Sequence, residues 1–285
     1  MSSLATAGTL GLDPGVLARR IRHLLLKELV GIGYGHFGGS LSIVEALAAL
    51  YGQEMRIRPD DPQWEGRDRL VLSKGHAAPA LYAALAAIGT IPTGLLTTLN
   101  ANGTMLPSHA DRVKVPGVEM TTGSMGQGIS AAAGMAYGLR AAGRDNRVYV
   151  IAGDGELNEG QCWEAAQFIA HHRLTNLVVL VDDNKKQLDG PTREICEPFD
   201  LVEKFTAFGF EAHSVAGQDA TAIKEALVRA RAATERPVCL VLDTLKGAGV
   251  PYLQEMAANH HVRLDDEGKR ILSAVLADLD EGAER

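Results

Sequence analysis

The sequence has few aromatic residues, few cysteines, no excess of basic residues and no long apolar run. Aromatic side chains make up 5% of its 285 residues, so small and aliphatic side chains must form most of the core. The three cysteines, Cys162, Cys196 and Cys239, form no CxxC pair, which favours buried or free thiols over disulfides or metal ligands. The formal net charge of -7 argues against a surface for nucleic acid or acidic lipid.

The bulk composition is that of an ordinary globular protein, with 46% hydrophobic and 22% charged residues. No segment reaches the ~20 consecutive apolar residues that a transmembrane helix needs, and the opening residues lack the basic-then-apolar order of a secretory signal. We therefore expect a cytoplasmic protein with no membrane partner. Because no repeat, low-complexity linker or change of composition divides the chain, we expect one domain over residues 1–285.

Short apolar runs in the chain are typical of strands that are buried on both faces. The expected strands are Val148–Ala152, Leu177–Val181 and Val238–Leu242, with weaker candidates at Arg69–Leu72 and Phe210–Val215. Helical patterns separate these runs. Strands that alternate with helices form βαβ units, so the sequence predicts an α/β fold: a predominantly parallel sheet with helices on both faces.

Apolar spacing and capping residues predict the helices. Asp13 and Pro14 are typical of a helix N-terminus, and this first helix is expected to end near Gly31. The segment Gly31–Gly39 is expected to form a glycine-rich loop. Further helices are expected at Ser42–Leu50, Ala78–Gly89, Asn158–His171, Asp219–Thr234 and, as an acidic amphipathic helix, Asp265–Arg285.

Polar motifs follow two consecutive strands, Gly153–Asp154–Gly155 after the first and Asp182–Asp183–Asn184 after the second. Because ligands of open α/β sheets bind beyond the carboxyl ends of the strands, we expect these motifs to lie together. Asp154 and Asn184 offer the hard oxygen atoms that Mg²⁺ prefers, and the glycines let a bulky anion approach the backbone. Alone, Asp154 could merely cap the next helix, but its pairing with Asn184 favours a metal site that holds phosphate.

This motif pair resembles the thiamine-diphosphate-binding motif, and the segments around it resemble transketolase. The further segments that carry the resemblance are Leu72–Tyr82, Ser108–His109, Met120–Met135 and Asp189–Gly190. Together they follow the family's order and cover its N-terminal half, from about Leu24 to His260. The resemblance implies the thiamine-diphosphate-binding fold, thiamine diphosphate with Mg²⁺ (or Ca²⁺ or Mn²⁺), and transfer of a two-carbon ketol unit from a phosphorylated ketose to an aldose.

The resemblance also implies roles for individual residues. Asp154 and Asn184 should bind the metal through their side chains, and Lys186 through its backbone carbonyl. The family usually has an apolar residue in place of Lys186, so this side chain must find solvent or an anionic partner. Met125 and Leu188 should contact the apolar faces of the cofactor rings. The other residues that the resemblance places at the cofactor are His76, Gly123, Ser124, Gly153, Gly155, Glu156 and Lys246, although an exposed lysine is the simpler interpretation of Lys246.

Four histidines are the candidate catalytic residues: His36, His76, His109 and His260. The first three lie in glycine- or proline-flanked loops, and imidazoles suit the transfer of protons to and from sugar hydroxyls near neutral pH. By resemblance, His76 and His109 lie near the diphosphate and the reacting carbon, and His36 and His260 near the substrate hydroxyls. His261 is an alternative to His260, because the family often has glycine after its histidine. We expect His23, His171, His172 and His213 to be ordinary surface or helix-end residues.

The resemblance stops before the family's second domain, which holds the aminopyrimidine ring and supplies an activating glutamate. We therefore expect a separate C-terminal-half (pyrimidine-binding) partner subunit in an α2β2 heterotetramer. Glu159 and Glu164 match carboxylates at the family's subunit contact, although acidic residues also favour a helix N-terminus for electrostatic reasons. Two alternatives stay open: a specialised ketol transferase for an unusual sugar, and a non-catalytic regulatory subunit that binds the cofactor.

Overall fold

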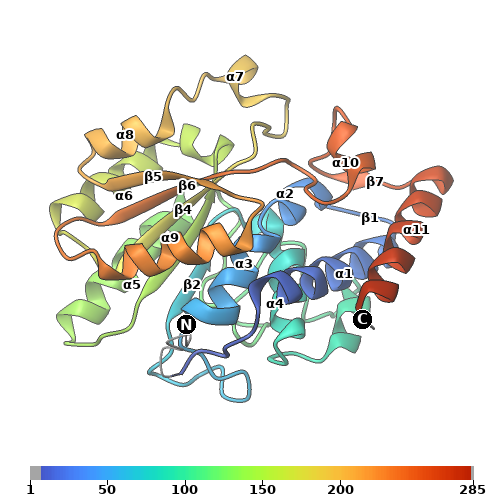
Figure 1. The fold of residues 1–285 in the computed structure, drawn as a ribbon, viewed down its shortest axis with the longest axis horizontal. Helices are drawn as coiled ribbons and strands as arrows, with labels where there is room; N and C mark the ends of the chain where they lie inside the picture. The colour runs from blue at the N-terminus through green and yellow to red at the C-terminus, as the bar shows by residue number, and fades with distance from the viewer. Residues whose placement is uncertain (1–7, 284–285) are drawn as a thin grey trace.

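A five-stranded, entirely parallel sheet forms the centre of the molecule (Figure 1). The computed structural model describes residues 8–283. In spatial order the strands are β2 (Arg69–Leu72), β3 (Val148–Gly153), β4 (Leu177–Asp183), β6 (Val238–Asp243) and β5 (Glu211–Ala216). All five expected strands are present, and the prediction of a parallel α/β sheet is confirmed.

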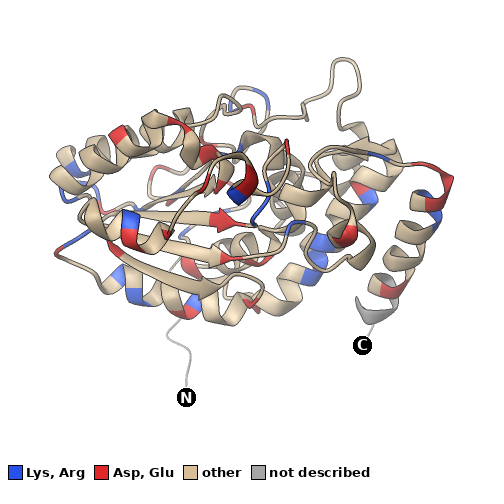
Figure 2. Cartoon of the chain, turned by 90° about the horizontal axis from the view of Figure 1, so that it is seen from above, with Lys and Arg blue, Asp and Glu red and all other residues tan. Residues whose placement is uncertain are grey.

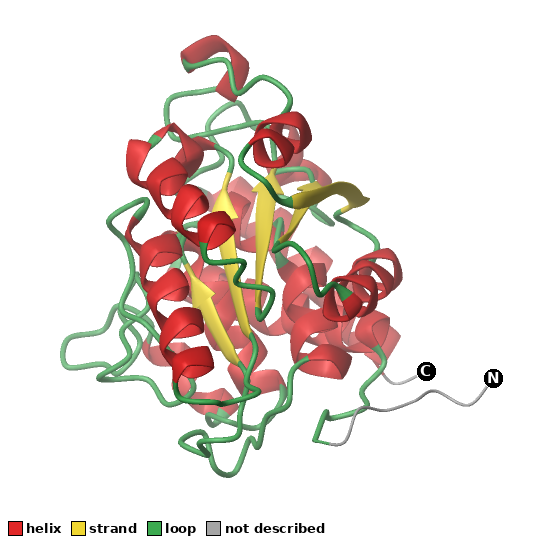
Figure 3. Cartoon of the chain, turned by 90° about the vertical axis from the view of Figure 1, so that its left-hand side faces the viewer, coloured by secondary structure: helices red, strands yellow, loops and turns green. Residues whose placement is uncertain are grey.

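Helices cover both faces of the sheet, which leaves the strands between two apolar layers (Figure 3). In β4, Val178 and Leu180 face one layer, whereas Val179 and Val181 face the other, as the two-residue period of a strand requires. The first layer contains α1 (Pro14–Ile32), α3 (Val44–Ala49), α4 (Ala78–Ala87), α9 (Ala220–Ala232) and α11 (Asp266–Ala283). The second contains α5 (Gln127–Ala141), α6 (Gly160–His171) and α8 (Leu201–Ala207).

Local capping explains where the first helix and α9 begin. Asp13 accepts a hydrogen bond from the amide of Val16 at 2.9 Å, so the predicted N-terminus of α1 is confirmed. Asp219 caps α9 in the same way, through the amides of Thr221 and Ala222. The remaining helical segments are short: α7 (Thr192–Ile195), α10 (Pro251–Glu255) and 3₁₀ turns at Gly75–Ala77, Thr93–Thr98 and Gly155–Asn158.

One prediction near the start of the chain was wrong. The segment expected as a loop, Gly31–Gly39, contains β1 (Tyr34–Gly35) and the beginning of α2 (Phe37–Leu41). The helix expected over Ser42–Leu50 is present as α3, which begins two residues later and continues into a wider π-helical turn, residues 50–54. Just after α2, the Ser42 hydroxyl donates to Asp182 Oδ2 at 2.7 Å.

A small antiparallel pair brings distant segments together. Strand β1 pairs with β7 (Val262–Arg263), and the amide of Gly38 donates to the Asn259 carbonyl at 3.0 Å. The segment that carries His36 therefore lies against the segment that carries His260. None of the helices within residues 8–283 combines the length and the apolar character of a membrane span.

Gly128, near the start of α5, tests how closely this helix approaches the turn after β2. A Cβ atom at Gly128 would lie 2.6 Å from the Ser73 Cα atom. We expect Gly128→Ala to lower the free energy of unfolding by ~1–3 kcal/mol, because the backbone must shift. Gly134→Ala in the same helix is the control: its Cβ would meet nothing within 4 Å, and alanine should stabilise the helix by ~0.5–1 kcal/mol. Equal stability of the two variants in urea unfolding would contradict this packing.

Candidate active site

A cavity of about 280 Å³ opens at the carboxyl edge of the sheet. Every residue that the sequence analysis assigned to the site lines this cavity, except Ser124, which is exposed beside it. Sequence analysis had not assigned three lining residues to the site: Lys74, Gln187 and Asp189. Acidic and basic segments lie together around the tips of the strands (Figure 2). The fold thus gathers the expected metal ligands and the expected histidines in one place.

Asp154 is a buried carboxylate at the end of β3. Its Oδ1 accepts from the amide of Gly155 and its Oδ2 from the amide of Lys185, both at 2.8 Å. Burial, followed by the nearby Asp182 carboxylate, raises the pKa of Asp154 to about 7. A carboxylate in this environment gains from a bound cation, because the cation offsets both causes.

Asn184 presents its oxygen and its nitrogen to different partners. Its Nδ2 donates to Asp182 Oδ2 at 2.7 Å, and its Oδ1 accepts from the amide of Lys186 at 3.2 Å. The amide oxygen is therefore turned away from the Asp182 carboxylate. Together with Asp154 and the Lys186 carbonyl, it forms a set of hard oxygen donors of the kind that Mg²⁺ prefers.

The Lys186 carbonyl already faces a cation. The buried Lys246 ammonium donates to this carbonyl at 2.9 Å and lies 3.1 Å from Nδ1 of His260. Burial, followed by the charge of Lys74, lowers the pKa of Lys246 to about 8. The carbonyl therefore faces positive charge, and its role as a metal ligand stays a prediction. Lys246 is buried, so the interpretation of an exposed lysine was wrong.

The Lys186 side chain points away from this carbonyl contact. Its Nζ donates to the Met256 carbonyl at 3.1 Å, close to the end of α10. Lys186 is partly exposed, as expected for a side chain that finds solvent, and a neutral backbone oxygen accepts one of its hydrogen bonds. The contact ties the loop after β4 to the segment that leads to His260.

Asp182, at the end of β4, is a buried charged residue that contacts the cavity residues Lys74 and Asn184. Sequence analysis did not assign it a role of its own. It is fully buried and accepts hydrogen bonds from Ser42, Asn184, Thr244 and Lys74. Burial opposes its ionisation, but the Lys74 ammonium and the hydrogen bonds outweigh burial and hold the pKa of Asp182 below its usual value. Its position at the end of the apolar strand β4 was the only signal in the sequence.

Glu156 has its carboxylate occupied by the protein itself. Oε1 accepts from the Ser73 hydroxyl at 2.5 Å and from the amide of Gly126 at 2.9 Å, and Oε2 accepts from the amide of Gly153 at 3.1 Å. These bonds join the turns that follow β2 and β3 to the start of α5. Direct contact between Glu156 and a cofactor stays a prediction.

The four candidate catalytic histidines form one cluster around His36. Its ring centroid lies 5.5 Å from that of His76, 5.6 Å from that of His109 and 5.4 Å from that of His260. Burial is the largest cause of the lowered pKa of all four, with further lowering from neighbouring positive groups at His36, His76 and His260. The pKa of His36 falls to about 4 and that of His260 to about 3. At neutral pH each ring is uncharged, so it can donate through one nitrogen and accept through the other.

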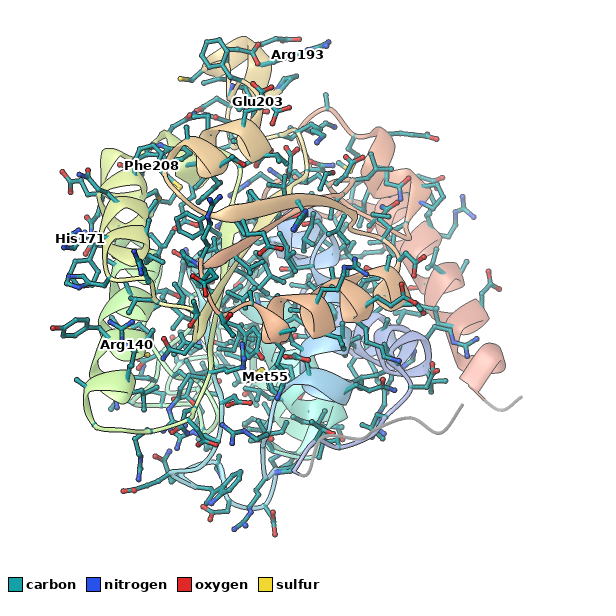
Figure 4. The ribbon with its side chains drawn as sticks, turned by 60° about the vertical axis from the view of Figure 1, so that its left-hand side comes forward. Met55, Arg140, His171, Arg193, Glu203 and Phe208 are labelled. Atoms are coloured by element: carbon teal, nitrogen blue, oxygen red, sulfur yellow. The ribbon has the colours of Figure 1, made fainter. Side chains whose placement is uncertain are left out.

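His260, rather than His261, lines the cavity. Both rings lie near that of His36, at 5.4 Å for His260 and 4.8 Å for His261. His261 is exposed, whereas His260 lines the cavity with its ring 4.6 Å from that of His76. The geometry therefore favours His260 of the two alternatives. The histidines expected at the surface include His171, which projects outward from α6, as does Arg140 from α5 (Figure 4).

Several residues at the rim of the cavity are largely exposed. Met125 is 49% exposed and Leu188 is 67% exposed, although both line the cavity. Glu159 and Glu164 are exposed at the start of α6, and the Glu159 side chain does not cap the helix. Their proposed place at a subunit contact stays a prediction.

Comparisons with known proteins identify the family. Residues 15–276 match the family model described as the thiamine-diphosphate-binding domain of transketolase. The chain belongs to the transketolase family. The crystal structure of a transketolase variant from Pichia stipitis matches this chain with a TM-score of 0.84 and 32% sequence identity. The match covers 93% of this chain and 40% of that transketolase.

Among transketolase relatives, shorter ones match over most of their length. A protein of Clostridium sp. named 6-deoxy-6-sulfo-D-fructose transketolase subunit SqwG is 48% identical over 93% of this chain and 96% of its own length. A protein of Phocaeicola vulgatus, named as one of the subunits of apulose-4-phosphate transketolase, is 38% identical over 82% of this chain and 85% of its own length. The transketolase of Mycobacterium bovis is 34% identical, and the match covers 37% of it.

The depressed pKa of His36 predicts how acid affects stability. Between its ordinary value of 6.5 and its folded value of about 4, an unfolded His36 binds a proton that the folded one does not. Its contribution to the free energy of unfolding is therefore constant above pH 6.5 and falls as the pH drops through this window. We expect His36→Gln to reduce the slope of stability against pH there, measured by urea unfolding. His171→Gln at the surface is the control, and equal slopes in the two variants would contradict the prediction.

Proposed function

We propose that this chain is the diphosphate-binding subunit of a heteromeric, thiamine-diphosphate-dependent transketolase. One observation carries the proposal: a set of hard oxygen donors and a cluster of uncharged histidines share a single cavity at the carboxyl edge of the sheet. The matched family domain is the one that binds thiamine diphosphate. The proposed reaction moves a two-carbon ketol unit from a ketose to an aldose.

The metal would be held by Asp154, Asn184 and the Lys186 carbonyl, with Mg²⁺ (or Ca²⁺ or Mn²⁺) as the ion. These oxygens fit a hard divalent cation. The Lys186 carbonyl already accepts a hydrogen bond from the positively charged Lys246 ammonium. The cofactor's diphosphate would complete the coordination, next to the glycines at 153 and 155. When bound, thiamine diphosphate supplies a carbon nucleophile and accepts the electron pair of the broken carbon–carbon bond.

The histidines would bind and orient the sugar. His36 and His260 would hydrogen-bond its hydroxyl groups, and His76 and His109 would hold or move protons near the reacting carbon. Uncharged imidazoles can do both, because each has one donor nitrogen and one acceptor nitrogen. Met125 and Leu188 would cover the apolar faces of the cofactor rings and exclude water from the reacting atoms.

A C-terminal-half partner would complete the site, in an α2β2 assembly. Relatives that match this chain over most of their length are named as transketolase subunits, whereas the single-chain transketolases are more than twice as long as the matched part. The exposed Met125 and Leu188 are surfaces that such a partner could cover. Glu159 and Glu164 are proposed to lie at a subunit contact.

The donor would be a ketose with an anionic group, either a phosphate or a sulfonate. The relative at 48% identity is named for a sulfonated ketose, and the Phocaeicola vulgatus relative is named for a sugar phosphate. The higher identity favours the sulfonated donor, which is the specialised alternative among the functions expected from the sequence. A sulfonate carries one negative charge, whereas a phosphate carries about -1.5 to -2 at neutral pH, so a site can distinguish them electrostatically.

Asp154→Ala tests the metal site directly. We expect thiamine diphosphate to bind at least ~100-fold more weakly at a fixed Mg²⁺ concentration, because a charged ligand of the metal is lost. Isothermal titration calorimetry would measure the dissociation constant. Asp183→Asn is the control, because its carboxylate pairs with Lys185 instead of facing the cavity. Unchanged cofactor affinity in Asp154→Ala would mean that the metal binds elsewhere.

Reconstitution tests whether the enzyme is split between two chains. We expect no ketol transfer by this chain alone, and transfer once a C-terminal-half partner is added, measured by coupled aldehyde release. Comparing kcat/KM for a 6-sulfonated and a 6-phosphorylated ketose would identify the donor class, and the partner alone is the control. Full activity of the isolated chain would refute the split enzyme, and cofactor binding without transfer in the assembled complex would favour a regulatory role.

A further inference from the structure

A buried ion pair lies directly beneath the proposed metal site. Lys74 is 1% exposed and Asp182 is 0% exposed, and the Lys74 ammonium donates to Asp182 Oδ2. The same oxygen accepts from Ser42 Oγ and from Asn184 Nδ2, each at 2.7 Å. The other oxygen, Oδ1, accepts from the Thr244 hydroxyl. The donors come from the end of α2, from the turn after β2 and from the loops after β4 and β6.

We propose that Asp182, held by Lys74, is the positioning residue that sets which end of the Asn184 amide faces the metal. This inference rests on the proposed metal site. An ionised carboxylate can only accept hydrogen bonds, so only the NH₂ end of Asn184 can face it. The oxygen end then points to the other side, where it is available to a cation. A flipped amide would turn its hydrogens toward the cation and lose a ligand.

Among the described residues, no other contact of Asn184 gives the same discrimination. Its oxygen accepts from the Lys186 amide at 3.2 Å, which is longer than the 2.7 Å contact to Asp182. The shorter bond also involves a charged acceptor, and charge-assisted hydrogen bonds are about twice as strong as neutral ones. The preference for one orientation of the amide therefore comes mainly from Asp182.

Lys74 extends this arrangement to the histidines. Its ammonium also donates to the Gly39 carbonyl at 2.9 Å, in the short helix that begins just after His36. A Cβ atom at Gly39 would lie 3.0 Å from Nε2 of His76 and 3.3 Å from Nζ of Lys74, so the ammonium and this ring lie close to the same backbone position. One buried ammonium thus contacts both Asp182 and the backbone beside the histidine cluster.

Asp182→Asn tests the orientation directly. The Lys74 ammonium keeps the oxygen of the introduced amide on the side of Asn184, but a neutral amide oxygen is a weaker acceptor than a carboxylate, so Asn184 is held less firmly in one orientation. We expect the full-length chain to bind Mn²⁺ about 10–100-fold more weakly in the presence of thiamine diphosphate, as is typical when a partner of a metal ligand is lost. Electron paramagnetic resonance of free Mn²⁺ measures this affinity without any activity assay.

The swap variant Asp182→Asn/Asn184→Asp separates orientation from mere structure. A carboxylate at position 184 has two equivalent oxygens, so it needs no orienting partner. We expect the swap to recover Mn²⁺ affinity relative to Asp182→Asn by about tenfold, within the range expected for such partners. A purely structural role predicts no recovery. Should Asp182→Asn not fold, the swap should still bind Mn²⁺ within about tenfold of the unchanged chain, because its carboxylate at position 184 needs no orienting partner.

Thr244→Val is the matched control. It removes the hydrogen bond to the other oxygen of Asp182 and leaves the contact with Asn184 in place. Mn²⁺ affinity should therefore change by less than about threefold, even if the free energy of unfolding falls. Unchanged affinity in Asp182→Asn, or no recovery in the swap, would overturn the inference. If Asp154→Ala also left Mn²⁺ affinity unchanged, the proposed metal site itself would be wrong. If Mn²⁺ affinity fell in Asp154→Ala but not in Asp182→Asn, only the proposed role of Asp182 would be refuted.

Discussion

The desolvation of charge at the carboxyl edge of the sheet is the constraint on which the rest of the site depends. Asp182 and Lys74 are both almost fully removed from water, and an unpaired charge at either position would be strongly destabilising. The fold meets this cost with donors from four separate segments, which must all converge on one carboxylate. A buried pair of this kind contributes little net stability, but it fixes the relative positions of the loops that surround it.

The same desolvation determines the chemistry available in the cavity. It lowers the pKa of His36 and His260 and raises that of Asp154, so the histidines are uncharged and the carboxylate gains from a nearby cation. The Lys246 ammonium supplies positive charge at the Lys186 carbonyl and further disfavours protonation of His260. Cation binding and uncharged histidines therefore support each other electrostatically.

Sequence reasoning identified the strands and the two motifs because their signals are local. An apolar run such as Leu177–Val181 is buried on both faces, and parallel strands bring the residues that follow them to one edge. The contact between Ser42 and Asp182 was not predictable, because the two residues are distant in sequence. Lys74 was missed for a similar reason: a lysine is normally exposed, and only its buried partner explains its position.

Two lysines, Lys186 and Lys246, determine how the loop after β4 contacts its neighbours. Lys186 replaces an apolar residue usual in the family, yet its backbone carbonyl still faces a cation, because the side chain leaves the cavity to reach Met256. That bond joins the loop after β4 to the segment that ends at β7, and Lys246, in the loop after β6, contacts both the Lys186 carbonyl and His260. Movement of the loop after β4 would therefore displace His260, so the proposed ligand oxygens and this histidine must be positioned together.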